Sequence, residues 1–197
     1  MILKLFFIFF VLIFARGDYV ISVLNDVHLD LKYDPYADVK SFCQEGGTKD
    51  STYAPYGRHG CDSPYSLFKS TLKKMVEVNP NPNLIIVPGD LVTHMVSSEK
   101  DTFNLTDYAE LKRVIENHTR EVAMSFPNTP IVFTLGNNDY AMNYQVPNKT
   151  YKEDYYSFVF QKIVTEIKAN GISVIIVINY RIHLRILRCL SRLVVTL

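Results

Sequence analysis

The stretch LIIVPGDLVTH, Leu84–His94, decides the fold, because four apolar residues run directly into a proline, a glycine and an acidic residue. A short apolar run bounded by turn residues is typical of a buried strand. Tyr19–Leu24 and Ile131–Leu135 are similar runs, and each also ends in a polar cluster. Strands that alternate with helical patterns predict an α/β fold, in which the residues after each strand meet at one edge of the sheet.

Apolar side chains spaced three or four residues apart indicate amphipathic helices between these strands. One helix opens after Pro64, a second covers residues 105–122, and a third fits residues 154–169 and ends before Gly171. His118 lies on the apolar stripe of the second helix. We therefore expect His118 to be a half-buried packing residue.

The composition is that of one packed globular domain, since 48% of the 197 residues are hydrophobic. The net charge of +1 provides no basic field for nucleic acid, so no nucleic-acid partner is expected. Composition leaves the oligomeric state open.

Residues 1–17 have the features of a secretory signal peptide: Lys4, ten apolar residues, then small residues. The alternative, an uncleaved membrane anchor, would need about 20 apolar residues. Export predicts a secreted protein or one of the lysosomal or vacuolar lumen. The domain itself is expected to span residues 18–170.

The segment 171–197 differs from the rest because it contains arginine but no Asp or Glu. It is treated as an anomalous basic hydrophobic tail. One interpretation is an amphipathic helix on a membrane surface, and the other is a segment that belongs to no evolved fold.

Residues 32–62 are too long for an ordinary connection and are interpreted as a functional or disulfide-pinned excursion. In an oxidising compartment Cys43 and Cys61 are expected to form a disulfide, and two free thiols are the alternative. Cys189 is unpaired under either interpretation. Expected glycosylation sites are the N-x-T sequons at Asn104, Asn117 and Asn148.

The polar clusters after the three strands have the composition of a two-cation site. Asp26 and His28 can bind one cation through a carboxylate and an imidazole. Asp90 can bridge that cation to a second one, which the amide oxygen of Asn137 can hold. Two adjacent divalent cations can activate water against a phosphoryl group, so the pattern predicts phosphoester hydrolysis.

The order Asp26-x-His28, Gly89-Asp90, Gly136-Asn137 resembles that of calcineurin-like metallophosphoesterases, over roughly residues 18–160. The segments 89–94 and 43–64 are most similar to those of acid sphingomyelinase-like phosphodiesterases, with secreted endopolyphosphatases as a second similar group. The resemblance implies layers of sheet and helices, two divalent metal ions with zinc expected, and a phosphodiester substrate such as a sphingolipid.

The same resemblance makes His94 a proton donor or orienting group near the scissile phosphate. Asn138 stands where many members have a phosphate-contacting histidine. Members also supply later metal-binding histidines in Gly-His and His-x-His segments, whereas the only later histidine here is His183, expected to be a tail residue. The chain therefore resembles a truncated N-terminal half. Weak metal binding and an exposed hydrophobic sheet edge are expected, and an inactive fragment is the alternative to an enzyme.

Overall fold

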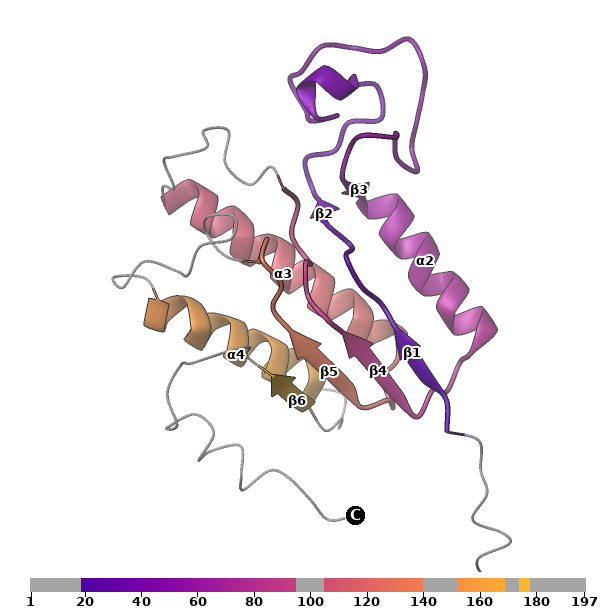
Figure 1. Cartoon of the computed structure of the whole chain (residues 1–197), viewed down its shortest axis with the longest axis vertical. Coiled ribbons are helices and arrows are strands. Elements are labelled where there is room, and N and C mark those ends of the chain that lie inside the picture. Colours follow the sequence, from indigo (N-terminus) through magenta and orange to yellow (C-terminus); the bar gives the residue numbers. More distant parts are fainter. Residues whose placement is uncertain (1–18, 95–104, 140–151, 169–173, 178–197) are drawn as a thin grey trace, which may run out of the picture.

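The computed structural model describes residues 19–94, 105–139, 152–168 and 174–177. Its main sheet is parallel, with the strand order β1-β4-β5-β6, and a second, two-stranded sheet pairs β2 with β3 (Figure 1). The strands are β1 Ile21–Val23, β2 Leu29–Asp30, β3 Ser63–Pro64, β4 Leu84–Val87, β5 Ile131–Thr134 and β6 Val174–Val177. The helices are the short 3-10 helix η1 Val39–Ser41 and the α-helices α2 Tyr65–Val78, α3 Leu105–Ser125 and α4 Lys152–Lys168.

The predicted α/β fold is confirmed, and each predicted strand and helix is present with boundaries shifted by a few residues. The predicted first strand is longer than β1, because the chain leaves the sheet at Leu24 to form the turn that contains Asp26. The short strands β2 and β3 were not predicted. Two residues each are too few to show a period of alternation.

The helices form one layer against the sheet. Parallel crossovers are right-handed, so a strand order that never reverses places successive helices on the same face. Consistently, α3 contacts both α2 and α4. Alternate residues of the two central strands fill the core: Ile85, Val87, Ile131 and Phe133 are fully buried.

The opposite face is more open at the β1 edge of the sheet. Ile21 and Val23 are 47% and 59% exposed, and they flank Ser22, which is in register with the buried Ile85. Parallel sheets usually have both faces covered. The expectation of an exposed apolar edge is therefore confirmed at β1.

The segment set apart by its composition contributes to the sheet. Val174–Val177 forms β6, which pairs with β5 from Ile131 to Thr134. A run of Val and Ile suits a strand next to a buried neighbour, whatever the charge of the residues that follow. The remainder of residues 171–197 and the expected signal peptide lie outside the described residues.

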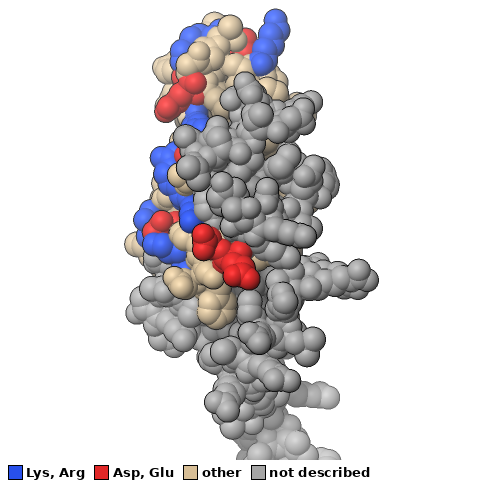
Figure 2. Space-filling model, turned by 90° about the vertical axis from the view of Figure 1, so that its left-hand side faces the viewer, with Lys and Arg blue, Asp and Glu red and all other residues tan. Residues whose placement is uncertain are grey.

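The described surface carries charges of both signs. On the face shown in Figure 2, Lys and Arg side chains lie among Asp and Glu, and neither sign forms an unbroken field on the coloured part of the chain. Within the ranges that the structure describes, no helix is both long and apolar enough to cross a bilayer.

Candidate metal centre

Backbone hydrogen bonds fasten the turns after β1 and β4 to each other. His28 N donates to Asp90 O at 3.0 Å, and Leu29 N donates to Leu91 O at 2.8 Å. On the other side, Ser63 N donates to His28 O at 3.1 Å as β3 joins β2. The segment around His28 is thereby held between the turn after β4 and the residues that precede β3.

Three predicted ligands converge where these turns meet. Asp26, His28 and Asp90 each offer one ligand atom, and these atoms all lie within 4.8 Å of one another. All three residues have left-handed backbone, with φ of 51°, 44° and 51°. Non-glycine residues seldom adopt this conformation, and it concentrates at functional sites. The backbone is therefore strained at these three residues, and this conformation brings their side chains together.

The hydrogen bond of His28 fixes which ring nitrogen can bind a cation. Nδ1 lies 3.1 Å from the carbonyl oxygen of Val92, which can only accept, so Nδ1 carries the proton. Nε2 then presents its lone pair, 3.9 Å from Oδ1 of Asp26. Two lone-pair atoms that face each other favour a cation between them, and this donor set fits a divalent metal.

Asn138 holds the Asp90 carboxylate in place through two hydrogen bonds. Its backbone N and its Nδ2 donate to Asp90 Oδ1 at 2.9 and 3.3 Å, and its side chain is almost fully buried. The residue predicted to act at the phosphate is thus placed as a hydrogen-bond donor to a candidate metal ligand. Asn137, the predicted amide ligand, lies between Asn138 and Gly136 and is half-buried.

Sequence reasoning missed Asp139, whose fully buried carboxylate joins the turns after β4 and β5. Oδ1 accepts from the backbone N of Leu91 and Val92 at 2.7 and 3.1 Å, and Oδ2 accepts from Gly136 N at 2.8 Å. Burial raises the pKa of Asp139 to about 6, and these three N–H groups oppose the rise. The one sign of this role in the sequence is the position of Asp139 at the end of the cluster Gly-Asn-Asn-Asp.

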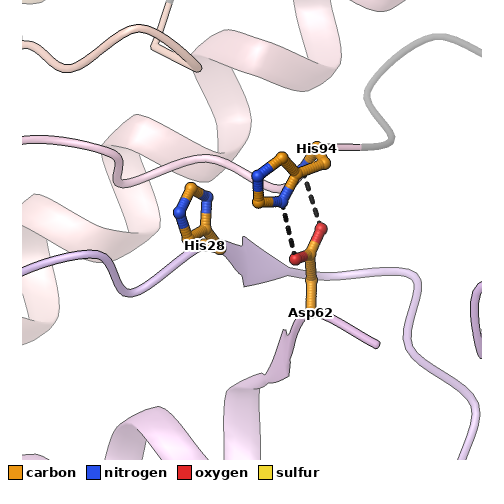
Figure 3. Close-up of side chains that lie close together, drawn as sticks. All are labelled: His28, Asp62 and His94. Carbon is orange, nitrogen blue, oxygen red and sulfur yellow. Dashed lines mark hydrogen bonds and ion pairs between the residues drawn. The ribbon is translucent and has the colours of Figure 1, made fainter. Parts of the chain in front are cut away.

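His28 also belongs to a second group, with Asp62 and His94, which Figure 3 shows. The rings of His28 and His94 are stacked, with centroids 4.1 Å apart and planes 25° apart. An ion shared by stacked rings would lie out of both ring planes, where neither nitrogen lone pair points. Asp62 is also already occupied as an acceptor, with Oδ1 2.9 Å from His94 Nδ1. Asp26, His28 and Asp90 are therefore the better candidate group for a cation.

The remaining predicted residues are placed as follows. Cys43 and Cys61 form the predicted disulfide, with an S–S distance of 2.11 Å. Asn117 lies on α3, where its Nδ2 donates to the carbonyl oxygen of Arg113 at 2.8 Å. Outside the described residues lie Asn104, Asn148 and His183.

Replacing Gly136 with Ala should weaken divalent-cation binding by roughly 10- to 100-fold, the loss typical of a disturbed supporting residue. An added Cβ would lie closer than 3.0 Å to both the backbone N and Oδ1 of Asp90, so the ligand must move. Calorimetric titration with Zn²⁺ measures the effect. Gly46→Ala is the control, because a Cβ there meets nothing within 4 Å and the strain at its left-handed backbone, with φ of 82°, falls in the 32–62 excursion and not at Asp90. Equal affinity in the two variants would contradict the placement of Asp90.

Known proteins share sequence with most of this chain. The sequence profile described as calcineurin-like phosphoesterase matches residues 19–192. An acid sphingomyelinase-like phosphodiesterase 3b of Mus musculus is 31% identical over 134 residues, which are 66% of this chain and 28% of that protein. A cyclic GMP-AMP phosphodiesterase of Mus musculus is 32% identical over 130 residues, which are 66% of this chain and 28% of that protein.

A more distant relative is sphingomyelinase phosphodiesterase D of Dictyostelium discoideum, 27% identical over 118 residues, or 60% of this chain and 24% of that protein. The chain thus spans about a quarter of the length of the curated relatives it matches. Family members are phosphoric ester hydrolases that use divalent metals. The profile match covers the whole described sheet and both turns that hold Asp26, His28 and Asp90, so the chain belongs to the calcineurin-like phosphoesterase family.

Proposed function

We propose that this chain forms part of a divalent-cation-dependent phosphodiesterase site, with Asp26, His28 and Asp90 as ligands. The observation that carries the proposal is their convergence within 4.8 Å on left-handed backbone, beside His94. Two carboxylates held this close repel each other unless a positive charge lies between them. The protein therefore holds these ligand atoms in a geometry suited to a cation before the cation binds.

The contacts of each residue indicate its proposed role. Bound divalent cations supply positive charge for the phosphoryl group and lower the pKa of water. Asn138 orients Asp90 through two hydrogen bonds. His94 has half of its side chain exposed next to the ligands, which lets its Nε2 pass a proton to the leaving oxygen of the ester.

Zinc is the proposed metal, because imidazole combined with carboxylates is a usual zinc ligand set. Asn137 is proposed to hold a second ion through its amide oxygen. The cluster supplies three ligands to one cation, which leaves a position for water or substrate. Three ligands also support a second candidate function, in which the chain binds a phosphoester without hydrolysing it.

The proposed substrate class is a phosphodiester. The names of two relatives refer to sphingomyelin and to cyclic GMP-AMP, which are quite different molecules. Both contain a phosphodiester, so the proposed substrate is defined by that group alone. We further propose that the chain acts after export, in a secreted or lumenal compartment. The leader pattern of residues 1–17 and the Cys43–Cys61 disulfide support that location.

The test is Zn²⁺ titration of the oxidatively folded chain, followed by hydrolysis of bis(4-nitrophenyl) phosphate, sphingomyelin and a cyclic dinucleotide. We expect zinc binding that is roughly 100-fold weaker in Asp90→Asn, because a charged carboxylate ligand is replaced by a neutral amide. Asp154→Asn removes an exposed carboxylate from α4 and is the matched control. Zinc affinity that is unchanged in Asp90→Asn would refute the site. Binding without turnover of any ester would favour the second candidate function.

A further inference from the structure

The Asp62 carboxylate contacts His94 at two atoms, the ring Nδ1 and the backbone N. Its Oδ1 lies 2.9 Å from His94 Nδ1, and its Oδ2 accepts from the backbone N of His94 at 2.7 Å (Figure 3). The hydroxyl of Thr93 donates to the same Oδ2 at 2.6 Å. Each carboxylate oxygen therefore has a defined partner, and both the ring and the backbone of His94 are held by one side chain.

These contacts determine the tautomer of His94. A carboxylate can only accept a hydrogen bond, so Nδ1 of His94 carries the proton and Nε2 is left for chemistry. His28 lies against one face of the ring at a centroid distance of 4.1 Å. The ring is thus restrained at its edge by Asp62 and on its face by His28.

The excursion of residues 32–62 delivers Asp62 to this place. The disulfide from Cys43 ends at Cys61, immediately before Asp62, and Ser63 N then bonds to His28 O at 3.1 Å. Covalent and backbone restraints therefore flank Asp62 on both sides. Only 16% of the Asp62 side chain is exposed, whereas half of the His94 side chain is open to solvent.

We propose that Asp62 is a positioning residue, which holds the Nδ1–H of His94 and so leaves Nε2 as the atom that takes up a proton from water and then gives it to the leaving oxygen of the substrate. The proposal rests on the proposed function for its catalytic meaning. The tautomer itself can be measured without cation, substrate or turnover. A buried carboxylate that holds a histidine in this way supports large rate effects in other hydrolases, where its replacement by Asn gives the wrong tautomer and a loss of roughly 10⁴-fold.

The test uses ¹⁵N-labelled, metal-free chain and long-range ¹H–¹⁵N correlation spectra of the histidine rings. Spectra are recorded under conditions in which the ring ¹⁵N shifts themselves show neutral imidazoles. In the wild type we expect His94 protonated at Nδ1. In Asp62→Asn the carboxamide can keep its oxygen on the backbone N of His94 and the hydroxyl of Thr93 and turn its NH₂ toward the ring. His94 should then accept at Nδ1 and carry its proton on Nε2.

Asp50→Asn is the matched control, because Asp50 lies in the same excursion and pairs with Arg58 at 3.1 Å instead of with a histidine. That variant should leave the tautomer of His94 unchanged. Asp62→Glu keeps the charge and should restore Nδ1–H at least in part. A wild-type ring protonated at Nε2, or a folded Asp62→Asn chain that keeps Nδ1–H, would overturn the proposal. Neither result bears on zinc binding by Asp26, His28 and Asp90, so failure here is distinct from failure of the metal site.

Discussion

Replacing Asp139 with Asn should lower the melting temperature of the chain by roughly 10 °C, from a loss of about 3 kcal/mol at two to four degrees per kcal/mol. Asp139 is fully buried and accepts from the backbone N of Leu91, Val92 and Gly136. Asn has one acceptor oxygen instead of two. Its NH₂ group would have to face a backbone N–H, so a buried donor would lose its partner.

The Asp139→Asn substitution should weaken zinc binding at the site as well as lower the stability of the fold. The two turns that Asp139 joins carry Asp90 and Asn138, which are bonded to each other at 2.9 Å. Circular dichroism gives the melting temperature, and zinc titration below that temperature reports the site. Asp154→Asn, on the exposed first turn of α4, should change stability by less than about 1 kcal/mol. A similar small change in Asp139→Asn would show that other contacts hold the two turns together.

The sequence predicted those parts of the site that follow directly from parallel strands. Asp26 and Asp90 each come after an apolar run, and the carboxyl ends of parallel strands meet at one edge. Their convergence could therefore be expected from local pattern alone. The strained backbone at Asp26, His28 and Asp90 could not be, because glycine is the usual signal for a left-handed residue and none of the three is glycine.

Residues whose roles depend on distant contacts were missed. Asp62 reaches His94 only because a disulfide and the two-residue strands β2 and β3 bring the excursion back to the sheet. Asp139 ends a polar cluster that has the composition of an ordinary loop, and only the contact with the neighbouring turn buries it. Strand β6 was missed because the arginine-rich composition of residues 171–197 outweighed the apolar run Val174–Val177.

His118 shows the limit of helical periodicity in the same way. The apolar stripe correctly predicted a packing residue, but the expected half-burial was wrong, because the side chain is fully buried. Its ring stacks on Phe68 of α2 at 4.7 Å and meets Phe133 of β5 edge-on at 6.3 Å. Among the described residues, neither ring nitrogen has a hydrogen-bond partner. Periodicity gives the face of one helix but not the two elements that enclose it.

Replacing His118 with Phe should therefore remove part of the acid sensitivity of the fold. Burial lowers the pKa of His118 to about 3, from an ordinary value of 6.5. The native ring stays neutral while the unfolded chain binds a proton as the pH falls below about 6.5. Stability is then lost progressively from about pH 6.5 down to about pH 3, amounting to about 2 kcal/mol between pH 7.5 and pH 5.

Urea unfolding of the wild type and of His118→Phe at pH 7.5 and pH 5 measures this difference. Phenylalanine keeps the stack on Phe68 and removes a buried N–H, while its larger ring adds some crowding, so the two effects should nearly offset each other at pH 7.5. At pH 5 the variant should be the more stable by about 2 kcal/mol. His59→Gln, which removes an exposed histidine of the excursion, should behave like the wild type. Other titrating groups are common to the chains compared, so equal pH dependence in wild type and His118→Phe would mean that His118 gains a proton in the native state and that the α2, α3 and β5 layer opens to admit it.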